Sequence, residues 1–118
     1  MQDFDNGNLK IKLSRDGEYI KMLWLGDSRT LNPASQLEPY LFPLVRELRN
    51  KKLVIDFTQL NSMNSSTVMP ILFFMRNLEK LAVITQIHYK GSSSWQRASF
   101  EVIANVVFDY NFIEVIAK

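Results

Sequence analysis

The stretch Leu53-Val-Ile-Asp-Phe57, followed by Thr58-Gln-Leu-Asn-Ser-Met-Asn-Ser-Ser-Thr67, decides the fold of this chain. Its first five residues are apolar and β-branched between polar flanks, which predicts a central strand covered on both faces. The next ten residues are a predicted loop dense in helix-capping residue types, and a helical pattern then runs from Val68 to about Leu81. The sequence therefore predicts a strand, a loop and a helix, with the loop at the carboxyl end of the strand.

The sequence after this unit continues the alternation. Val83 to Lys90 predicts another strand, and Gly91-Ser-Ser-Ser94 predicts a turn before a helix. Ser93 and Gln96 have the spacing of a capping box at the start of that helix. Phe112 to Ile116 predicts a last short strand or a turn of helix. The expected helix carries several large apolar residues: Trp95, Val102, Ile103, Val106 and Val107.

The sequence before the unit predicts a β-hairpin. Apolar and lysine residues alternate from Leu9 to Leu13, Arg15-Asp16-Gly17 supplies a turn, and Tyr19 to Leu25 predicts the returning strand. Gly26-Asp27-Ser28 is expected to end the hairpin, with Asp27 and Ser28 in a turn or at a partner contact.

A helix is expected between the hairpin and the central strand. Asn32-Pro33 is a suitable start and Asn50 a suitable end. Pro39 and Pro43 each remove a backbone donor, so the ordered helix is expected to begin nearer Tyr40 or to be kinked.

The predicted order is β-β-α-β-α-β-α, with a final strand as an option. It predicts an α/β fold whose mixed sheet opens with a hairpin and continues through βαβα crossovers, the later strands being parallel and the helices packed on the sheet. No linker or repeat divides the chain, so residues 1–118 are expected to form a single domain.

Composition excludes several kinds of chemistry. The 118 residues include no cysteine and one histidine, which excludes disulfides, thiolate nucleophiles and most zinc sites. Fourteen basic residues against twelve acidic ones give a formal charge of +2, too small an excess to predict nucleic-acid binding. No glycine-rich phosphate-binding motif is present. Neither a signal peptide nor a membrane span is recognisable, so we expect a cytoplasmic protein without cofactor or metal.

Three consecutive hydroxyl residues, Ser65, Ser66 and Thr67, follow Asn64 where the helix should begin. One interpretation is ordinary helix capping, in which one side chain accepts a backbone N–H and the others are solvated. The other is a phosphorylation site, because a phosphate would lie against the positive end of the helix dipole and change the surface charge strongly.

The stretch from Leu53 to Val68 resembles the core segment of STAS domains of the anti-anti-sigma factor type. In that family a hydrophobic strand ending in Asp leads to Asp-Ser-Ser-Gly and a helix, and the first serine is phosphorylated. The resemblance points to Ser65 as phosphoacceptor, with Ser66 and Thr67 as fallback positions. Asn64 and Thr67 depart from the family's acidic residue and glycine. They agree better with the SiaC-like biofilm regulators, as do Gly26-Asp27-Ser28 and His88-Tyr89.

The resemblance implies a set of partners. A GHKL-type Ser/Thr kinase would add the phosphate and a metal-dependent phosphatase would remove it. The unmodified form would bind a target, which is an anti-sigma factor in the parent family and a diguanylate cyclase in the SiaC-like offshoot. The implied protein is a non-enzymatic bacterial signalling regulator.

The helix that follows the hydroxyl residues also suggests a partner surface. Val68, Ile71, Met75, Leu78 and Ala82 cluster on one face at 100° per residue. Met69 and Phe73 fall on the opposite side with Arg76, so they are expected either to bind a partner or to be covered by neighbouring elements or by a second copy in a homodimer.

Other candidate residues are weaker. Asp56 resembles the phosphorylated Asp of a receiver domain, but no acidic pair follows the first strand to bind magnesium, so we expect Asp56 to accept hydrogen bonds that organise the loop. His88 is expected to be a strand histidine at the polar edge of the sheet. Trp24 and Trp95 are expected in the core.

Three functional hypotheses follow from these observations. The first is a phosphorylation-dependent regulator that acts through Ser65, Asn64, Asp56 and the partner surface. The second is a constitutive interaction or assembly module without phosphoregulation. The third is an enzyme that takes its chemistry from a cofactor or substrate.

Overall fold

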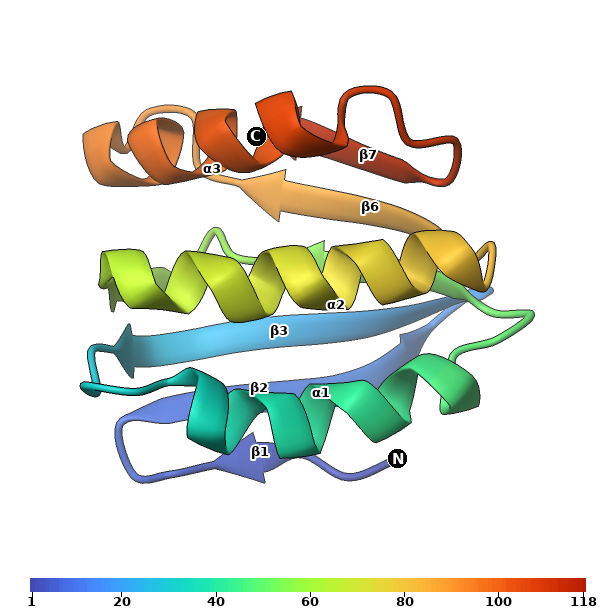
Figure 1. Ribbon diagram of the computed structural model, residues 1–118, viewed down its shortest axis with the longest axis horizontal. Helices are drawn as coiled ribbons and strands as arrows, with labels where there is room; N and C mark the ends of the chain where they lie inside the picture. Colours follow the sequence, from blue (N-terminus) through green and yellow to red (C-terminus); the bar gives the residue numbers. More distant parts are fainter.

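The computed structural model describes all 118 residues as a seven-stranded mixed sheet with three α-helices packed on one of its faces (Figure 1). The strands are β1 (Phe4–Asp5), β2 (Leu9–Asp16), β3 (Tyr19–Ser28), β4 (Lys52–Asp56), β5 (Leu60–Met63), β6 (Ile84–Tyr89) and β7 (Ile113–Ala117). The helices are α1 (Ala34–Glu47), the 3-10 turn η1 (Ser65–Thr67), α2 (Val68–Lys80) and α3 (Ser94–Val107). This architecture confirms the predicted α/β fold class.

The sheet order is β1-β2-β3-β4-β6-β7, and β5 pairs with the last residues of β3. The hairpin of β2 and β3 is antiparallel, as predicted, and its turn holds Gly17 at φ +63°. The β3–β4, β4–β6 and β6–β7 pairs are parallel. The last predicted element is therefore a strand and not a helical turn.

The central strand β4 is covered on one face only, contrary to the prediction. Leu53 and Ile55 are fully buried under the helices, whereas Val54 points to the uncovered face and is half-buried. The run reads as continuously apolar because Val54 contributes to the uncovered face of the sheet. All three α-helices lie on the same side (Figure 1).

Helix α1 continues through both prolines, so the predicted late start near Tyr40 is wrong. Pro39 and Pro43 lie on the exposed side of the helix, as does Ser35. The carbonyls that lose a donor belong to Ser35 and Pro39, four residues before each proline, and water can reach them on this side. The predicted start at Asn32-Pro33 agrees with the structure, in which Pro33 is the N-cap residue.

Two strands are absent from the predicted order. The short edge strand β1 pairs with β2, and β5 lies within the segment predicted as an unbroken loop. Gly26-Asp27-Ser28 does not end the hairpin, because β3 runs on to Ser28 and pairs there with β5.

The core lies between the sheet and the helices and contains 25 buried apolar residues. Aromatic rings connect its layers: Trp24 lies 4.9 Å from Phe57, and Phe57 lies 4.7 Å from Phe100, measured between ring centroids. Trp24 is buried and Trp95 is half-buried against the core, as expected. No helix combines the length and the apolar character that a membrane crossing requires.

Helix α3 begins at the predicted cap, but only half of the capping box forms. The Oγ of Ser93 accepts a hydrogen bond from the backbone N–H of Gln96 at 3.4 Å. The side chain of Gln96 does not return to Ser93. It is buried and binds the backbone of Phe57, Leu60 and Lys90 instead.

Candidate functional site

The hydroxyl residues form the 3-10 turn η1, which connects β5 to α2 at the carboxyl ends of β3 and β5. Asn64 precedes the turn in extended conformation, and its backbone N–H donates to the carbonyl of Ser28 at 2.9 Å. The turn is therefore fixed to the end of β3.

Thr67 is the buried centre of this turn. Its side chain is completely inaccessible, and its Oγ1 lies 2.8 Å from Ser28 Oγ and 2.8 Å from Asn64 Oδ1. The Thr67 hydroxyl has one proton, which it donates to the Asn64 carbonyl oxygen, and it accepts the proton of Ser28. Asn64 Nδ2 then donates to the carbonyl of Thr30 at 2.9 Å. We call Ser28, Asn64 and Thr67 the hydroxyl clamp.

Ser65 and Ser66 differ from Thr67 in exposure and in side-chain hydrogen bonding. Both are exposed, and neither side chain makes a hydrogen bond. Neither η1 nor α2 has a side-chain N-cap hydrogen bond, so the interpretation of the three hydroxyls as caps is wrong. The clamp fixes the turn through Thr67 and leaves Ser65 and Ser66 facing solvent.

Two predicted roles are corrected by these positions. Thr67 was expected as a fallback phosphoacceptor, but its hydroxyl is buried and engaged. Ser28 was expected at a partner contact, but it is 3% exposed and part of the hydroxyl clamp. Both residues hold the turn from inside. Asp27 is half-buried, and its carboxylate accepts a 2.6 Å hydrogen bond from Ser62 in β5.

Replacing Thr67 by valine is expected to lower the free energy of unfolding by about 2 kcal/mol, because Ser28 and Asn64 would keep buried polar atoms without a partner. Valine matches threonine in shape, so the loss isolates the hydroxyl. Thr67→Ser retains the hydroxyl and serves as the control, with an expected loss of about 1 kcal/mol for the buried methyl. Urea unfolding followed by circular dichroism measures both. A valine variant more stable than the serine variant would contradict the clamp.

An apolar surface lies along α2 beyond the turn. Met69 is 67% exposed and Phe73 is 42% exposed, while Ile71, Met75 and Leu78 are buried. This distribution confirms the predicted two-sided helix, except that Ala82 lies beyond its end and is exposed. Met69 and Phe73 are therefore exposed and at most partly covered by neighbouring elements of this chain.

Helix α1 extends that surface with a residue that sequence reasoning missed. The ring of Phe42 is 53% exposed and stacks on Phe73 at a centroid distance of 6.2 Å. Beside the Phe42 ring is a hollow of about 180 Å³ between α1 and α2. Arg46 and Lys80 line it, and they and Arg76 have no anionic partner. The exposed face of α2 is thus apolar with cations beside it. We call Met69, Phe73, Phe42 and Arg76 the α1–α2 surface.

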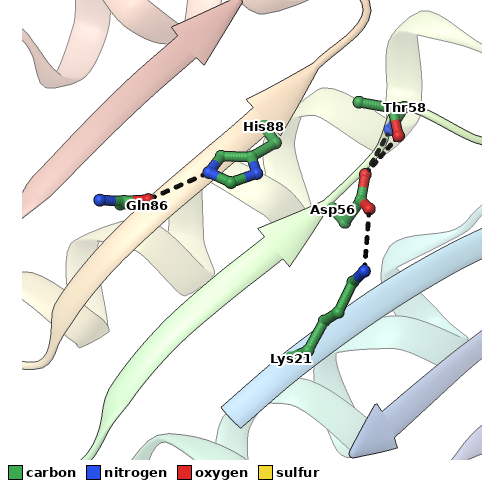
Figure 2. A network of polar contacts seen from close by, with 5 residues as sticks. All are labelled: Lys21, Asp56, Thr58, Gln86 and His88. Atoms are coloured by element: carbon green, nitrogen blue, oxygen red, sulfur yellow. Dashed lines mark hydrogen bonds and ion pairs between the residues drawn. The ribbon is translucent and has the colours of Figure 1, made fainter. Parts of the chain in front are cut away.

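Asp56 organises the loop after β4, as predicted (Figure 2). Its Oδ1 accepts hydrogen bonds from the backbone N–H and the hydroxyl of Thr58, at 2.8 and 2.6 Å. Its Oδ2 lies 3.5 Å from the Lys21 ammonium. Burial alone would raise the pKa of Asp56, but the Thr58 hydrogen bonds and the Lys21 charge outweigh burial and hold that pKa below its usual value. The carboxylate therefore stays ionised and fixes Thr58.

His88 lies on the uncovered face of the sheet and not at its edge, because β6 pairs with strands on both sides. Its Nε2 lies 3.0 Å from Gln86 Oε1 (Figure 2). Burial, and then the positive charge of Lys118, lower the pKa of His88. With Asp56 and Lys21 it lines a small hollow of about 150 Å³. No group of three or more residues of metal-binding type is clustered in the structure.

Comparison with known proteins identifies the fold. No protein-family model and no curated protein matches this sequence. Among solved structures, an anti-sigma factor antagonist from Mycobacterium paratuberculosis superposes with a TM-score of 0.64 at 13% identity, covering 86% of this chain and 85% of that one. The anti-sigma factor antagonist SpoIIAA in its unphosphorylated form gives 0.59 at 18% identity, covering 92% and 89%. The Bacillus cell fate determinant SpoIIAA in its phosphorylated form also gives 0.59 at 18%, covering 92% of each chain.

The chain therefore has the fold of these anti-sigma factor antagonists, which confirms the predicted STAS-like architecture. The closer resemblance to SiaC-like regulators stays a prediction.

Proposed function

We propose that this chain is a non-enzymatic regulator of the anti-anti-sigma type, switched by phosphorylation of Ser65, with Ser66 as the alternative acceptor. One observation carries the proposal: two exposed, unbonded serines lie at the start of α2 on a turn that the buried hydroxyl of Thr67 holds in place. An accessible acceptor on a fixed turn can gain a phosphate without loss of the fold. SpoIIAA, which shares the fold, is known in phosphorylated and unphosphorylated forms, and this supports the proposal.

Electrostatics makes such a modification effective. A phosphate at Ser65 adds a charge of about −1.5 to −2, which removes most of the formal charge of the chain. That formal charge is +2. The new anion lies near the positive end of the α2 dipole, so the folded domain tolerates it. For a partner, however, the dianion must be desolvated or avoided on docking.

The α1–α2 surface is the proposed docking face of the unmodified form. Met69 and Phe73 lie four residues apart on α2 and form an exposed stripe, which begins four residues after Ser65. Asp27, at the end of β3, is a second proposed contact on the side of the loop, and Arg76 is a third. A partner that covers this stripe would meet a phosphate on Ser65 directly.

The proposed partners are a GHKL-type Ser/Thr kinase, a metal-dependent phosphatase and a target that is an anti-sigma factor or a diguanylate cyclase, all in the cytoplasm. The Asn64–Thr67 hydrogen bond gives both departures from the family motif a common structural role. The relation to the SiaC-like regulators is proposed from the sequence at these two positions. Asn64 and Asp56 are the proposed supports of the switch.

Intact mass and fragment sequencing of the protein purified from its native cells test the acceptor. We expect one added phosphate that is absent from Ser65→Ala and retained in Ser66→Ala. A phosphate that is lost only in Ser66→Ala would identify Ser66 as the phosphoacceptor in place of Ser65. If no phosphate is found under any growth condition, the second candidate function, a constitutive interaction module that uses the same α1–α2 surface, would replace the proposal.

Partner capture from the same cells tests the switch. Ser65→Asp is expected to recover the target about tenfold less than Ser65→Ala, because a buried unpaired charge weakens docking. Ser92→Asp provides the control, since Ser92 is exposed in the turn before α3 and brings the same charge. Equal recovery by Ser65→Asp and Ser65→Ala would refute phosphorylation-dependent binding.

A further inference from the structure

The two edges of the sheet are not equally protected. At one edge lies β1, which has only two residues, and the carboxylate of Asp3 accepts a hydrogen bond from the backbone N–H of Leu13. At the other edge lies β7, with five residues and no element beyond it (Figure 1). No proline or lysine lies within β7, although such residues commonly block edge pairing.

The backbone of β7 presents free donors and acceptors along this edge. The carbonyl of Phe112 accepts from Thr85 and the N–H of Lys118 donates to Tyr89, so both residues face β6. Because backbone groups alternate along a strand, Ile113, Val115 and Ala117 direct their N–H and C=O groups outward. The outer side of β7 is therefore an unpaired strand edge.

The side chains that alternate with these groups form a self-complementary row. Glu114, Ile116 and Lys118 share the uncovered face of the sheet, on which Gln86 and His88 are the register partners of Glu114 and Ile116. Glu114 and Lys118 are exposed, and neither makes an ion pair within the chain. Along this row an acidic, an apolar and a basic side chain follow one another, each two residues apart.

We propose that β7 pairs antiparallel with β7 of a second copy of this chain, about a two-fold axis at Ile116. In this register Glu114 lies opposite Lys118 of the mate, and the reverse pair forms on the other side of the axis. Val115 and Ala117 exchange backbone hydrogen bonds with Ala117 and Val115 of the mate. The two sheets join into one continuous sheet.

Apolar surface lies at the amino-terminal end of this edge. Phe108 is 82% exposed and Phe112 is 37% exposed. They line a hollow of about 660 Å³ together with Ile113 and Glu114. A pairing of five-residue strands is small beside the roughly 1,600 Å² of a standard interface, so the dimer dissociates on dilution. It lies away from the Ser65 turn and is independent of the proposed phosphorylation.

Sedimentation equilibrium of the full chain over a roughly hundredfold concentration range tests the pairing. We expect a reversible monomer–dimer equilibrium. Glu114→Lys and Lys118→Glu are each expected to weaken the dimer about tenfold, since each places like charges opposite one another at two symmetric positions. The double reversal restores affinity to within about threefold of the wild type, because the opposite charges face each other again.

Glu38→Lys is the matched control, because Glu38 is exposed on α1 and the change in net charge is the same as in Glu114→Lys. It should leave the dimer unchanged. A chain that stays monomeric at every concentration would overturn the proposal. A dimer that is insensitive to the single reversals, or that the double reversal does not restore, would place the interface elsewhere.

Discussion

Gly26→Ala is expected to lower the free energy of unfolding by about 4 kcal/mol, through a steric overlap added to an unfavourable backbone angle. Gly26 has φ +88°, a conformation that residues with a side chain rarely adopt. A Cβ there would overlap the carbonyl oxygen of Asn8, which also accepts a hydrogen bond from Asp27. The Asn8 carbonyl belongs to the backbone, and the Cβ is fixed directly to the backbone of Gly26, so the overlap cannot be relieved without disturbing the hairpin.

The matched control is Gly17→Ala in the hairpin turn. Gly17 also has positive φ, but no atom lies within 4 Å of the position its Cβ would take. Its expected loss is the backbone cost alone, about 1 kcal/mol. Urea unfolding of both variants measures the difference, which reports the Asn8 contact. Equal losses of unfolding free energy in the two variants would mean that the overlap with Asn8 is relieved at no cost.

The function of Gly26 follows from its place in β3. The register between β3 and β5 shifts between Gly26 and Asp27, after which Asp27 pairs with Ser62 and Ser28 with Met63. Only a glycine permits this bend, which carries Ser28 to the hydroxyl clamp. Because the bend precedes the Ser65 turn, Gly26→Ala is also expected to expose Thr67, and hydrogen exchange of the Thr67 amide would show it.

Gln96→Leu is expected to lower the free energy of unfolding by about 3 kcal/mol, because it removes three hydrogen bonds of a buried side chain and leaves the backbone N–H of Lys90 without its acceptor. Gln96 is 1% exposed, and its Nε2 donates to the carbonyls of Phe57 and Leu60 at 2.8 and 3.2 Å. Its Oε1 accepts from the backbone N–H of Lys90 at 2.7 Å. Leucine has a similar size but can make none of these bonds.

Gln86→Leu makes the same chemical change on the uncovered face of the sheet. Gln86 is half-buried, and its side chain has one hydrogen-bond partner, His88. The expected loss is below about 0.5 kcal/mol, as for most surface substitutions. Thermal unfolding of the two variants side by side gives the comparison. A small loss at Gln96 would show that water replaces its hydrogen bonds.

The sequence pattern was sufficient to predict the strands and helices in which apolar residues recur with a clear period. The alternation from Leu9 to Leu13 and the apolar stripe of α2 follow directly from burial on one side of a strand or helix. It was insufficient for β5, because Leu60–Met63 is half polar and becomes a strand only by pairing with the bent end of β3. That pairing depends on tertiary contacts such as Asp27 to Ser62.

For the candidate site, the residue types indicated the place but not the roles. Three adjacent hydroxyls look equivalent in sequence, yet the 3-10 turn buries Thr67 and exposes Ser65 and Ser66. Phe42 was missed because the two prolines of α1 concealed its helical period. The spacing from Ser93 predicts only a local cap for Gln96, since no sequence pattern reveals a side chain that reaches backbone groups more than 30 residues away.

One side of β3 is divided between β4 and β5, and this division determines which part of the sheet can open alone. Tyr19–Leu23 pair with β4, whereas Gly26–Ser28 pair with β5, which has no other neighbour. Segment 58–67 is thus held by one short ladder, a few side-chain hydrogen bonds and the buried side chains of Leu60, Met63 and Thr67. A segment with so few strand partners opens locally at a lower free energy than the rest of the sheet. Opening there would present Ser65 in an extended, flexible stretch while β4 and the aromatic core remain closed. The persistence of the turn that carries Ser65 is then set by local opening and not by the global stability of the fold.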